Sequence, residues 1–294
     1  MGELAAIATA FCWAFTSIFF SYSGRHVGSV VVNLSRLLFA VLLLTATHFW
    51  LYGSLLPWQA EPFRWGWLSL SSLLGLVLGD GALFQAFVLL GPRLSTLIMA
   101  LVPIFTTFMG WLIFGETVSL LELAGISLTV GGVAWVVSEK RPGGAAVENK
   151  QYGLGILFGL GGALGQATGL IAAKFGLVGD FPAASATVIR MLVAMLVLWS
   201  VASLRGRVVS TVKQWQHRQV FSAIVAGTIV GPFLGVWLSL VAIQLARVGI
   251  ASTLMALTPI ILIPLSRLLL KEQISLRSIV GTLMALLGVT LIFL

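Results

Sequence analysis

The sequence predicts an all-α integral membrane protein with ten transmembrane helices in two inverted five-helix repeats. Three observations predict this fold: a very apolar composition, ten apolar runs of spanning length, and an internal repeat that relates the two halves of the chain. Hydrophobic residues make up 59% of the 294 residues and charged residues 9%. A soluble domain has about 45–50% apolar and about 25% charged residues. The composition therefore excludes an ordinary soluble enzyme and a disordered chain.

The distribution of charge and the few metal-binding side chains exclude further classes. The net charge is +8, but Lys and Arg are scattered among short connectors and form no basic face, so we expect no nucleic-acid partner. Cys12 is the single cysteine and allows no intramolecular disulfide. The three histidines lie far apart in sequence and give no metal-ligand spacing. We therefore expect neither a metal nor another cofactor.

Ten runs are long and apolar enough to cross a bilayer, which takes about 20 residues. They leave fewer than about a hundred residues for connectors and tails, so no soluble domain fits. The first run opens with Met1-Gly2-Glu3 and lacks a basic start, so it predicts a span rather than a cleavable signal peptide. The runs cover residues 3–22, 31–52, 66–89, 93–114, 120–138, 152–174, 183–203, 219–244, 247–268 and 276–294.

A polar stretch near the midpoint divides the chain. Residues 138–151 read SEKRPGGAAVENKQ, and the mixture of Gly, Pro and charge is typical of a linker. We therefore expect one five-helix repeat in residues 1–138, a linker in 139–151 and a second five-helix repeat in 152–294.

The two halves repeat each other. A shift of 156 residues places MALVPI (99–104) on MALTPI (255–260), and it also superposes several Gly and Glu positions. A shift of 154 places Arg36 on Arg190. Five spans per half is an odd number, so the second half starts from the opposite side of the membrane and the repeats must be inverted. Inverted repeats are typical of secondary transporters, whose substrate site lies between the halves near the bilayer midplane.

These residues also carry a family resemblance. The chain resembles the ten-span, two-repeat EamA branch of the drug/metabolite transporter superfamily. The pattern of the first half is Trp13, Arg36, the Ala100–Pro103 run, Gly115-Glu116 and glycines of the fifth span, and the second half repeats Arg190, Pro259, Glu272, Gly281 and Gly288. The resemblance covers nearly the whole chain. It implies a transporter, and because the family resembles exporters of amino acids and many other metabolites, it leaves the substrate open.

The halves differ at two motif positions. Lys271 stands where the first half has Gly115, and Gly165-Gln166 stands where the first half has Trp13-Ala14. We expect substrate chemistry at polar residues that have no equivalent in the other half.

Asp80 is the leading candidate for substrate binding because it lies well inside the third span and its repeat counterpart is Val236. A carboxylate at that depth costs about 2.5–3.5 kcal/mol on insertion scales, so a partner or water must compensate. It either holds a substrate amine or a transported proton, or it has a structural role, in which it pairs with a buried Arg or stays protonated and forms hydrogen bonds. Phe84 and Phe87 share its helix face, whereas Gln85 points about 140° away.

Arg36 and Arg190 occupy equivalent repeat positions about five residues into their spans. They either bind a substrate carboxylate or phosphate, or they reach the interface or a neighbouring loop carbonyl. Their presence in both halves favours the second interpretation.

Glu116 and Glu272 precede the fifth and tenth spans, where we expect them to cap helix N-termini.

Several further polar and aromatic residues lie within spans. Trp13 and Trp237 lie mid-span rather than at the interface, which fits either substrate binding or packing. Gln166 and Thr168 lie in the Gly-rich sixth span, and Gln244 lies near a helix end.

Glycines four apart allow helices to approach closely. Pro103, Pro259 and Pro264 interrupt helical hydrogen bonding and favour kinks.

The predicted function is therefore secondary transport of a small polar metabolite, such as an amino acid, outward across the plasma (inner) membrane. The chain has no GxxxxGK[ST] segment, so it does not itself encode ATP-driven transport. The alternative is a flippase for a lipid-linked substrate with a headgroup site on Arg36 or Arg190. An intramembrane enzyme would need a paired-Asp, Ser/His or metal constellation, which the sequence lacks.

The charges also bear on orientation. Connectors after odd-numbered spans carry eleven Lys and Arg, and those after even-numbered spans carry three. Lys and Arg concentrate on the cytoplasmic side, so the count predicts termini that face away from the cytoplasm. The family resemblance instead implies cytoplasmic termini.

Overall fold

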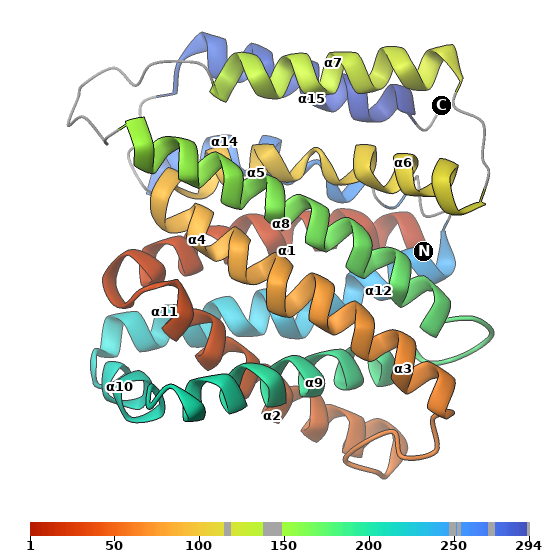
Figure 1. Cartoon of the computed structure of the whole chain (residues 1–294), viewed down its shortest axis with the longest axis vertical. Coiled ribbons are helices and arrows are strands. Elements are labelled where there is room, and N and C mark those ends of the chain that lie inside the picture. Colours follow the sequence, from red (N-terminus) through yellow and green to blue (C-terminus); the bar gives the residue numbers. More distant parts are fainter. Residues whose placement is uncertain (115–118, 138–148, 247–250, 252–253, 270–273, 293–294) are drawn as a thin grey trace.

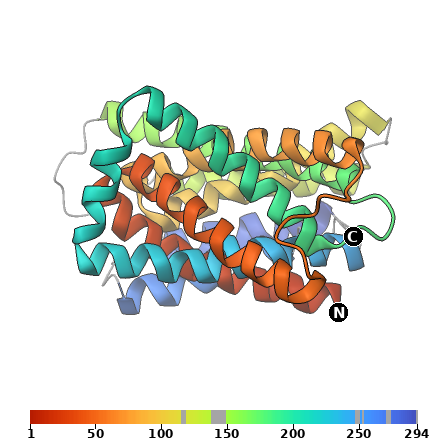
Figure 2. The ribbon, with the colours of Figure 1, turned by 90° about the horizontal axis from the view of Figure 1, so that it is seen from below.

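A computed structural model describes residues 1–114, 119–137, 149–246, 251, 254–269 and 274–292. Every regular element in these residues is helical. The long helices lie alongside one another, and the described connections lie at the two ends of the bundle (Figures 1 and 2).

The first half holds seven helical segments and a π-helix within the third span. In chain order these are α1 (Gly2–Val27), α2 (Ser29–Tyr52), α3 (Pro62–Ser71), η1 (Ser72–Gly79), α4 (Asp80–Leu90), α5 (Pro92–Met99), α6 (Val102–Phe114) and α7 (Leu120–Val137). The second half repeats the pattern with α8 (Asn149–Gly176), α9 (Ala183–Leu204), α10 (Val208–Lys213), η2 (Gln214–Gln216), α11 (Arg218–Thr228), η3 (Ile229–Gly235), α12 (Val236–Leu245), α14 (Thr258–Leu269) and α15 (Leu276–Ile292).

Eight helices of the described chain are long and apolar enough to cross a bilayer. The other two apolar helices are shorter. The 12 residues of α14 and the 17 of α15 reach about 18 Å and about 26 Å at 1.5 Å per residue. The predicted span 247–268 begins in residues that lie outside the described ranges. The structure thus confirms a multi-pass helical protein, and the number of ten spans stays a prediction.

Glycine and proline set where helices end. Gly28, with φ 88°, separates α1 from α2, and Gly91, with φ 86°, separates α4 from α5. Both are in a backbone region that side chains disfavour, so each chain reversal needs a glycine. Pro92 then begins α5, where the missing N–H costs no helical hydrogen bond.

Both halves break their fourth span at equivalent residues. A turn at Ala100 and Leu101 separates α5 from α6, and the equivalent turn at Ala256 and Leu257 precedes α14. Pro103 and Pro259 therefore lie in the first turn of a new helix, where proline is tolerated, rather than kinking a continuous one. Pro264 lies inside α14.

A π-helix interrupts the third span of each half at equivalent positions. η1 ends at Gly79 and η3 at Gly235, which are related by the 156-residue shift. A π-helical turn inserts extra residues into a helix and changes the direction of the side chains that follow. In this protein those are Asp80 and Val236, the first residues of α4 and α12.

The first helix of each half packs against the third span of the other half. A Cβ atom on Gly165 of α8 would lie 2.6 Å from Gly79 Cα, and one on Gly169 would lie 2.8 Å from Gly75 Cα. In the equivalent contact, a Cβ on Gly235 would lie 3.1 Å from Cys12 Cβ of α1. Only glycine allows the backbones to approach this closely.

These contacts correct one detail of the repeat alignment. Gly79 lies beside Gly165 and Gln166, and Gly235 lies beside Cys12 and Trp13. Gln166 is therefore the structural equivalent of Trp13, one residue away from the alignment made on sequence alone.

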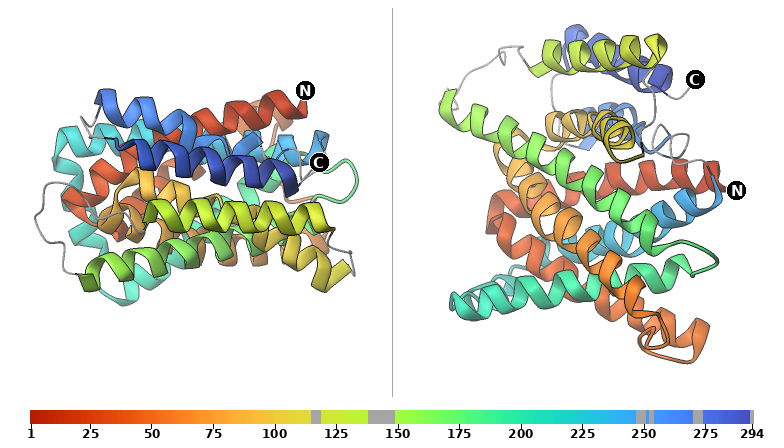
Figure 3. Two further views of the ribbon diagram at one scale, coloured as in Figure 1. Left: turned by 90° about the horizontal axis from the view of Figure 1, so that it is seen from above. Right: turned by 45° about the vertical axis from the view of Figure 1, so that its right-hand side comes forward.

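α7 and α15 pack side by side at one edge of the bundle (Figures 1 and 3). A Cβ on Gly132 would lie 2.6 Å from Ala285 N, and the Thr129 hydroxyl donates to Ala285 O at 3.2 Å. Large apolar side chains point outward around the bundle, including Leu112 and Leu157. An outward-facing apolar surface suits a lipid environment.

Candidate functional site

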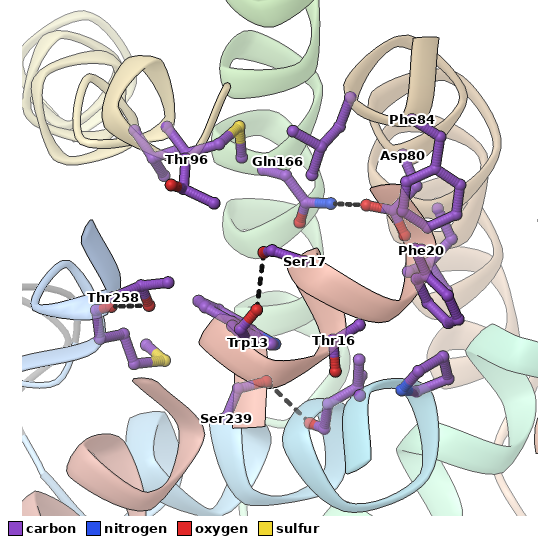
Figure 4. A pocket seen from close by; sticks show the side chains of 18 of the residues that line it. Trp13, Thr16, Ser17, Phe20, Asp80, Phe84, Thr96, Gln166, Ser239 and Thr258 are labelled. Atoms are coloured by element: carbon purple, nitrogen blue, oxygen red, sulfur yellow. Dashed lines mark hydrogen bonds between the residues drawn. The ribbon is translucent and has the colours of Figure 1, made fainter. Parts of the chain in front are cut away.

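A cavity of about 170 Å³ lies between the two halves. Side chains from both halves surround it, and Figure 4 shows Trp13 and Ser17 of α1 beside Gln166 of α8 and Asp80 of α4. Many of its lining residues are repeat equivalents: Arg36 and Arg190, Leu76 and Pro232, Asp80 and Val236, Leu83 and Ser239, Met99 and Met255, Ala100 and Ala256, Val102 and Thr258, and Pro103 and Pro259. The cavity therefore lies where the two repeats meet.

Asp80 and Arg36 form a buried ion pair on this cavity. Arg36 Nη2 donates to Asp80 Oδ2 at 2.7 Å, and the two residues are 2% and 7% exposed. Arg36 Nε donates to Asn33 Oδ1 at 2.9 Å, and its Nη2 also lies 3.5 Å from Leu76 O. The guanidinium lies 4.7 Å from the centre of the Phe84 ring. Arg36 thus has acceptors on several sides and is buried inside the protein.

Gln166 connects this pair to the second half. Its Nε2 donates to Asp80 Oδ1 and lies 3.3 Å from Gly75 O (Figure 4). The close approach of α8 to η1 brings this amide within reach of the carboxylate. Both oxygens of Asp80 are therefore engaged, one by Arg36 and one by Gln166.

Arg190 occupies the equivalent position in the second half with different surroundings. It lines the cavity, is 4% exposed, and its Nε has no hydrogen-bond partner among the described residues. The Ser72 hydroxyl donates to the backbone oxygen of Arg190 at 2.5 Å, which ties α9 to η1. Asp80 lines the same cavity, and it forms its ion pair with Arg36.

The rest of the wall is mainly apolar. Phe20 and Phe84 meet edge to face with centroids 5.2 Å apart, and Phe84 stacks on Phe87 at 5.8 Å. Trp13 and Met255 also line the cavity. The cavity therefore combines a charged cluster with an aromatic surface.

The structure brings six of the seven candidate residues together: Trp13, Arg36, Asp80, Phe84, Gln166 and Arg190 all line the cavity. Trp237 does not line it. It packs on Phe233, with ring centroids 6.2 Å apart, and on a buried apolar cluster that includes Leu240.

The other candidates have local partners or cannot be placed. Thr168 donates to Leu164 O and Gly165 O of its own helix, and Gln244 donates to Phe181 O. Glu116 and Glu272, together with Gly115 and Lys271, lie outside the described residues.

Sequence reasoning missed several lining residues. Thr16, Ser17 and Phe20 follow Trp13 at helical spacing on α1, so the position of Trp13 was the available signal. Met99 and Met255 lie in the repeated MALxPI run, which was recognised as a repeat and not as cavity lining. Nothing in the sequence identified Asn33, because its contribution is a hydrogen bond that it accepts from the Arg36 side chain.

No group of three His, Cys, Asp or Glu side chains in the described part of the chain could hold a metal ion. His48 instead has a structural role. One ring nitrogen lies 2.6 Å from Ser54 O and the other 3.0 Å from Ser185 Oγ, which joins α2 to α9.

Comparison with known proteins decides the family. The family model described as the EamA-like transporter family matches residues 1–138 and 153–294. The chain belongs to this family. EamA-like proteins are membrane transporters of small molecules and not enzymes, so the chain is an integral, multi-pass membrane transporter.

Solved structures share the fold of this chain. One of them, described only as the crystal structure of a protein, aligns with 99% of this chain and 95% of its own, with a TM-score of 0.68 and 17% sequence identity. At that identity the similarity shows the fold alone. A search of curated proteins finds no match.

Proposed function

We propose that this EamA-like protein is a secondary exporter of small polar metabolites, such as amino acids, in the plasma membrane. The two repeats, 1–138 and 152–294, have inverted topology, are joined by the linker 139–151 and move against each other to open the cavity to each side in turn. The seven candidate residues named from the sequence are proposed to bind or position the substrate, with Trp237 acting from outside the cavity lining.

One observation carries the proposal: the cavity between the halves is lined by equivalent residues of both repeats and contains buried charges. Buried charges in a membrane protein are costly and typically mark a substrate or ion pathway. A site between repeats is also where alternating access exposes a substrate to either side.

Uptake into proteoliposomes tests this function. Purified protein is reconstituted and given labelled amino acids and small organic acids, each with and without an imposed pH gradient. We expect saturable uptake of at least one class, and protein-free liposomes supply the background. No uptake across the panel, together with movement of a lipid-linked substrate between leaflets, would support the flippase instead.

A matched pair of variants tests the location of the site. Ala256→Phe places a ring on a cavity-lining residue and should abolish uptake. Ala124→Phe makes the same change on an exposed position of α7 and should leave uptake within about twofold of the unmodified protein. Equal activity of the two variants would place the pathway elsewhere.

A further inference from the structure

The equivalent arginines Arg36 and Arg190 have different polar surroundings in the two halves. Arg36 donates to Asn33 and Asp80. In the second half the 154-residue shift replaces Asn33 with Thr187, and the 156-residue shift replaces Asp80 with Val236. Arg36 therefore has two side-chain acceptors in the first half, and the equivalent positions of the second half provide Arg190 with neither.

The side chains at these equivalent positions cannot replace the two acceptors. The Thr187 hydroxyl donates to Ala183 O at 2.8 Å, within its own helix, and Val236 has no polar atom. Arg190 Nε is buried without a partner among the described residues. A buried cation without a hydrogen-bonded counter-charge is costly. An anion that enters the cavity would remove this cost.

The hydroxyl groups on the wall are poor donors to an anion. All five hydroxyl groups of the described lining donate to backbone oxygens, as Thr16, Ser17, Thr96, Ser239 and Thr258 each do. Each hydroxyl has a single proton to donate, so these groups present acceptor oxygens to the cavity. Among the described lining residues, Arg190 is therefore the charged donor that has no ion-pair partner, and the Trp13 indole N–H is an uncharged donor on the same cavity.

We propose that Arg190 docks a carboxylate of the transported substrate, and that the substrate is a monoanionic organic acid with an aromatic or branched apolar body. This inference rests on the proposed transport function and replaces its example of an amino acid with an organic acid that lacks an amine. The described lining carries Arg36, Asp80 and Arg190, a net charge of +1 that one carboxylate neutralises. A guanidinium binds a carboxylate through two parallel hydrogen bonds.

The same geometry disfavours two other kinds of substrate. An amine would need Asp80, whose two oxygens are already engaged by Arg36 and Gln166. A phosphate dianion would need a second free cation, and Arg36 is neutralised by Asp80. The aromatic wall formed by Phe20, Phe84 and Phe87 favours an apolar body on the acid.

Three compounds with one phenyl ring and different charges test the proposal: phenylpropionate (−1), phenylalanine (0) and phenylethylamine (+1). Binding to purified protein is measured by titration calorimetry, and uptake is measured in proteoliposomes. We expect phenylpropionate to bind most tightly. Arg190→Gln should weaken its binding about 10- to 100-fold, because hydrogen bonds to charged groups contribute about 1.5–3 kcal/mol. Arg190→Lys should be intermediate, and Arg25→Gln, on an exposed residue, should bind normally.

A second variant keeps the test valid if Arg190→Gln folds poorly. Val236→Asp restores in the second half the acid that Asp80 supplies in the first, so it should neutralise Arg190 and weaken phenylpropionate binding while Arg190 itself is unchanged. The control is Val241→Asn, a polar change on the same helix and outside the cavity lining.

Three results would overturn the inference: tighter binding of the amine or of phenylalanine, unchanged phenylpropionate binding in both Arg190→Gln and Val236→Asp, or no binding of any of the three compounds. Saturable uptake of another solute in the same proteoliposomes would leave the transport function standing. Lipid movement without solute uptake would overturn both proposals.

Discussion

At the scale of single residues, Arg36 and Asp80 form an ion pair whose two charges are costly to bury. Each charge is buried and depends on the other for compensation, with Gln166 and Asn33 holding the outer hydrogen bonds. Removing one member of such a pair leaves an uncompensated buried charge and costs about 3–5 kcal/mol. Replacing both members with apolar residues of similar volume is often close to neutral.

We therefore expect Asp80→Leu alone to lower the melting temperature strongly, and the double variant Arg36→Leu, Asp80→Leu to recover much of the loss. Thermal unfolding of the purified protein in detergent measures these two variants and Arg36→Leu alone. A double variant whose loss equals the sum of the two single losses would show that the pair does not contribute as a unit.

Asp80→Asn separates two roles in transport. If Asp80 carries a coupled proton, the variant should lose gradient-driven accumulation and keep counterflow exchange. Because both carboxylate oxygens already have partners, we expect the other result, in which accumulation and exchange fall together. Both are measured in proteoliposomes, relative to the amount of folded protein.

At the scale of helices, glycine contacts set how closely α8 approaches the third span of the first half. Gly165 faces the backbone of Gly79, whereas a Cβ on Gly153 of the same helix would meet nothing within 4 Å. This approach also places Gln166 within reach of Asp80. Packing and the charged cluster are therefore linked through one helix.

We expect Gly165→Val to destabilise the protein by about 1–3 kcal/mol, because the added atoms push the two helices apart. It should also reduce transport by separating Gln166 from Asp80. Gly153→Ala, the control on the same helix, should be neutral or slightly stabilising, since alanine favours helix over glycine. Equal melting temperatures for the two variants would contradict the packing described here.

The helices show what a single sequence could predict. The internal repeat predicted a site between the two halves, and the equivalent arginines were among the candidate residues for it. The MALxPI run was evidence for the repeat alone. The hydrogen bond between Gln166 and Asp80 could not be predicted from the sequence. It forms because α8, the first helix of the second half, packs against the third span of the first half. The π-helices also shift side-chain direction within a span, and Trp237, next to Val236, lies outside the cavity lining.

At the scale of the whole molecule, equivalent positions of inverted repeats must face opposite sides of the membrane. Gln59 and Lys213 are related by the 154-residue shift and both are exposed. In a Cys12→Ala background, Gln59→Cys should react with an impermeant thiol reagent in intact cells. Lys213→Cys should be protected, as the distribution of Lys and Arg predicts.

Labelling of both positions from one side would contradict inverted topology. The reverse pattern, with position 213 labelled and position 59 protected, would keep the inversion and place the termini in the cytoplasm, as the family resemblance implies.

The central claim is that substrate passes through the cavity between the halves. Modification of a single cysteine at Met255, a lining residue, tests it most directly. In a Cys12→Ala background that retains transport, alkylation of Met255→Cys should abolish counterflow, and the transported compound should slow that reaction. Alkylation of Lys213→Cys should have no effect. Counterflow that persists after complete alkylation at position 255 would contradict the account.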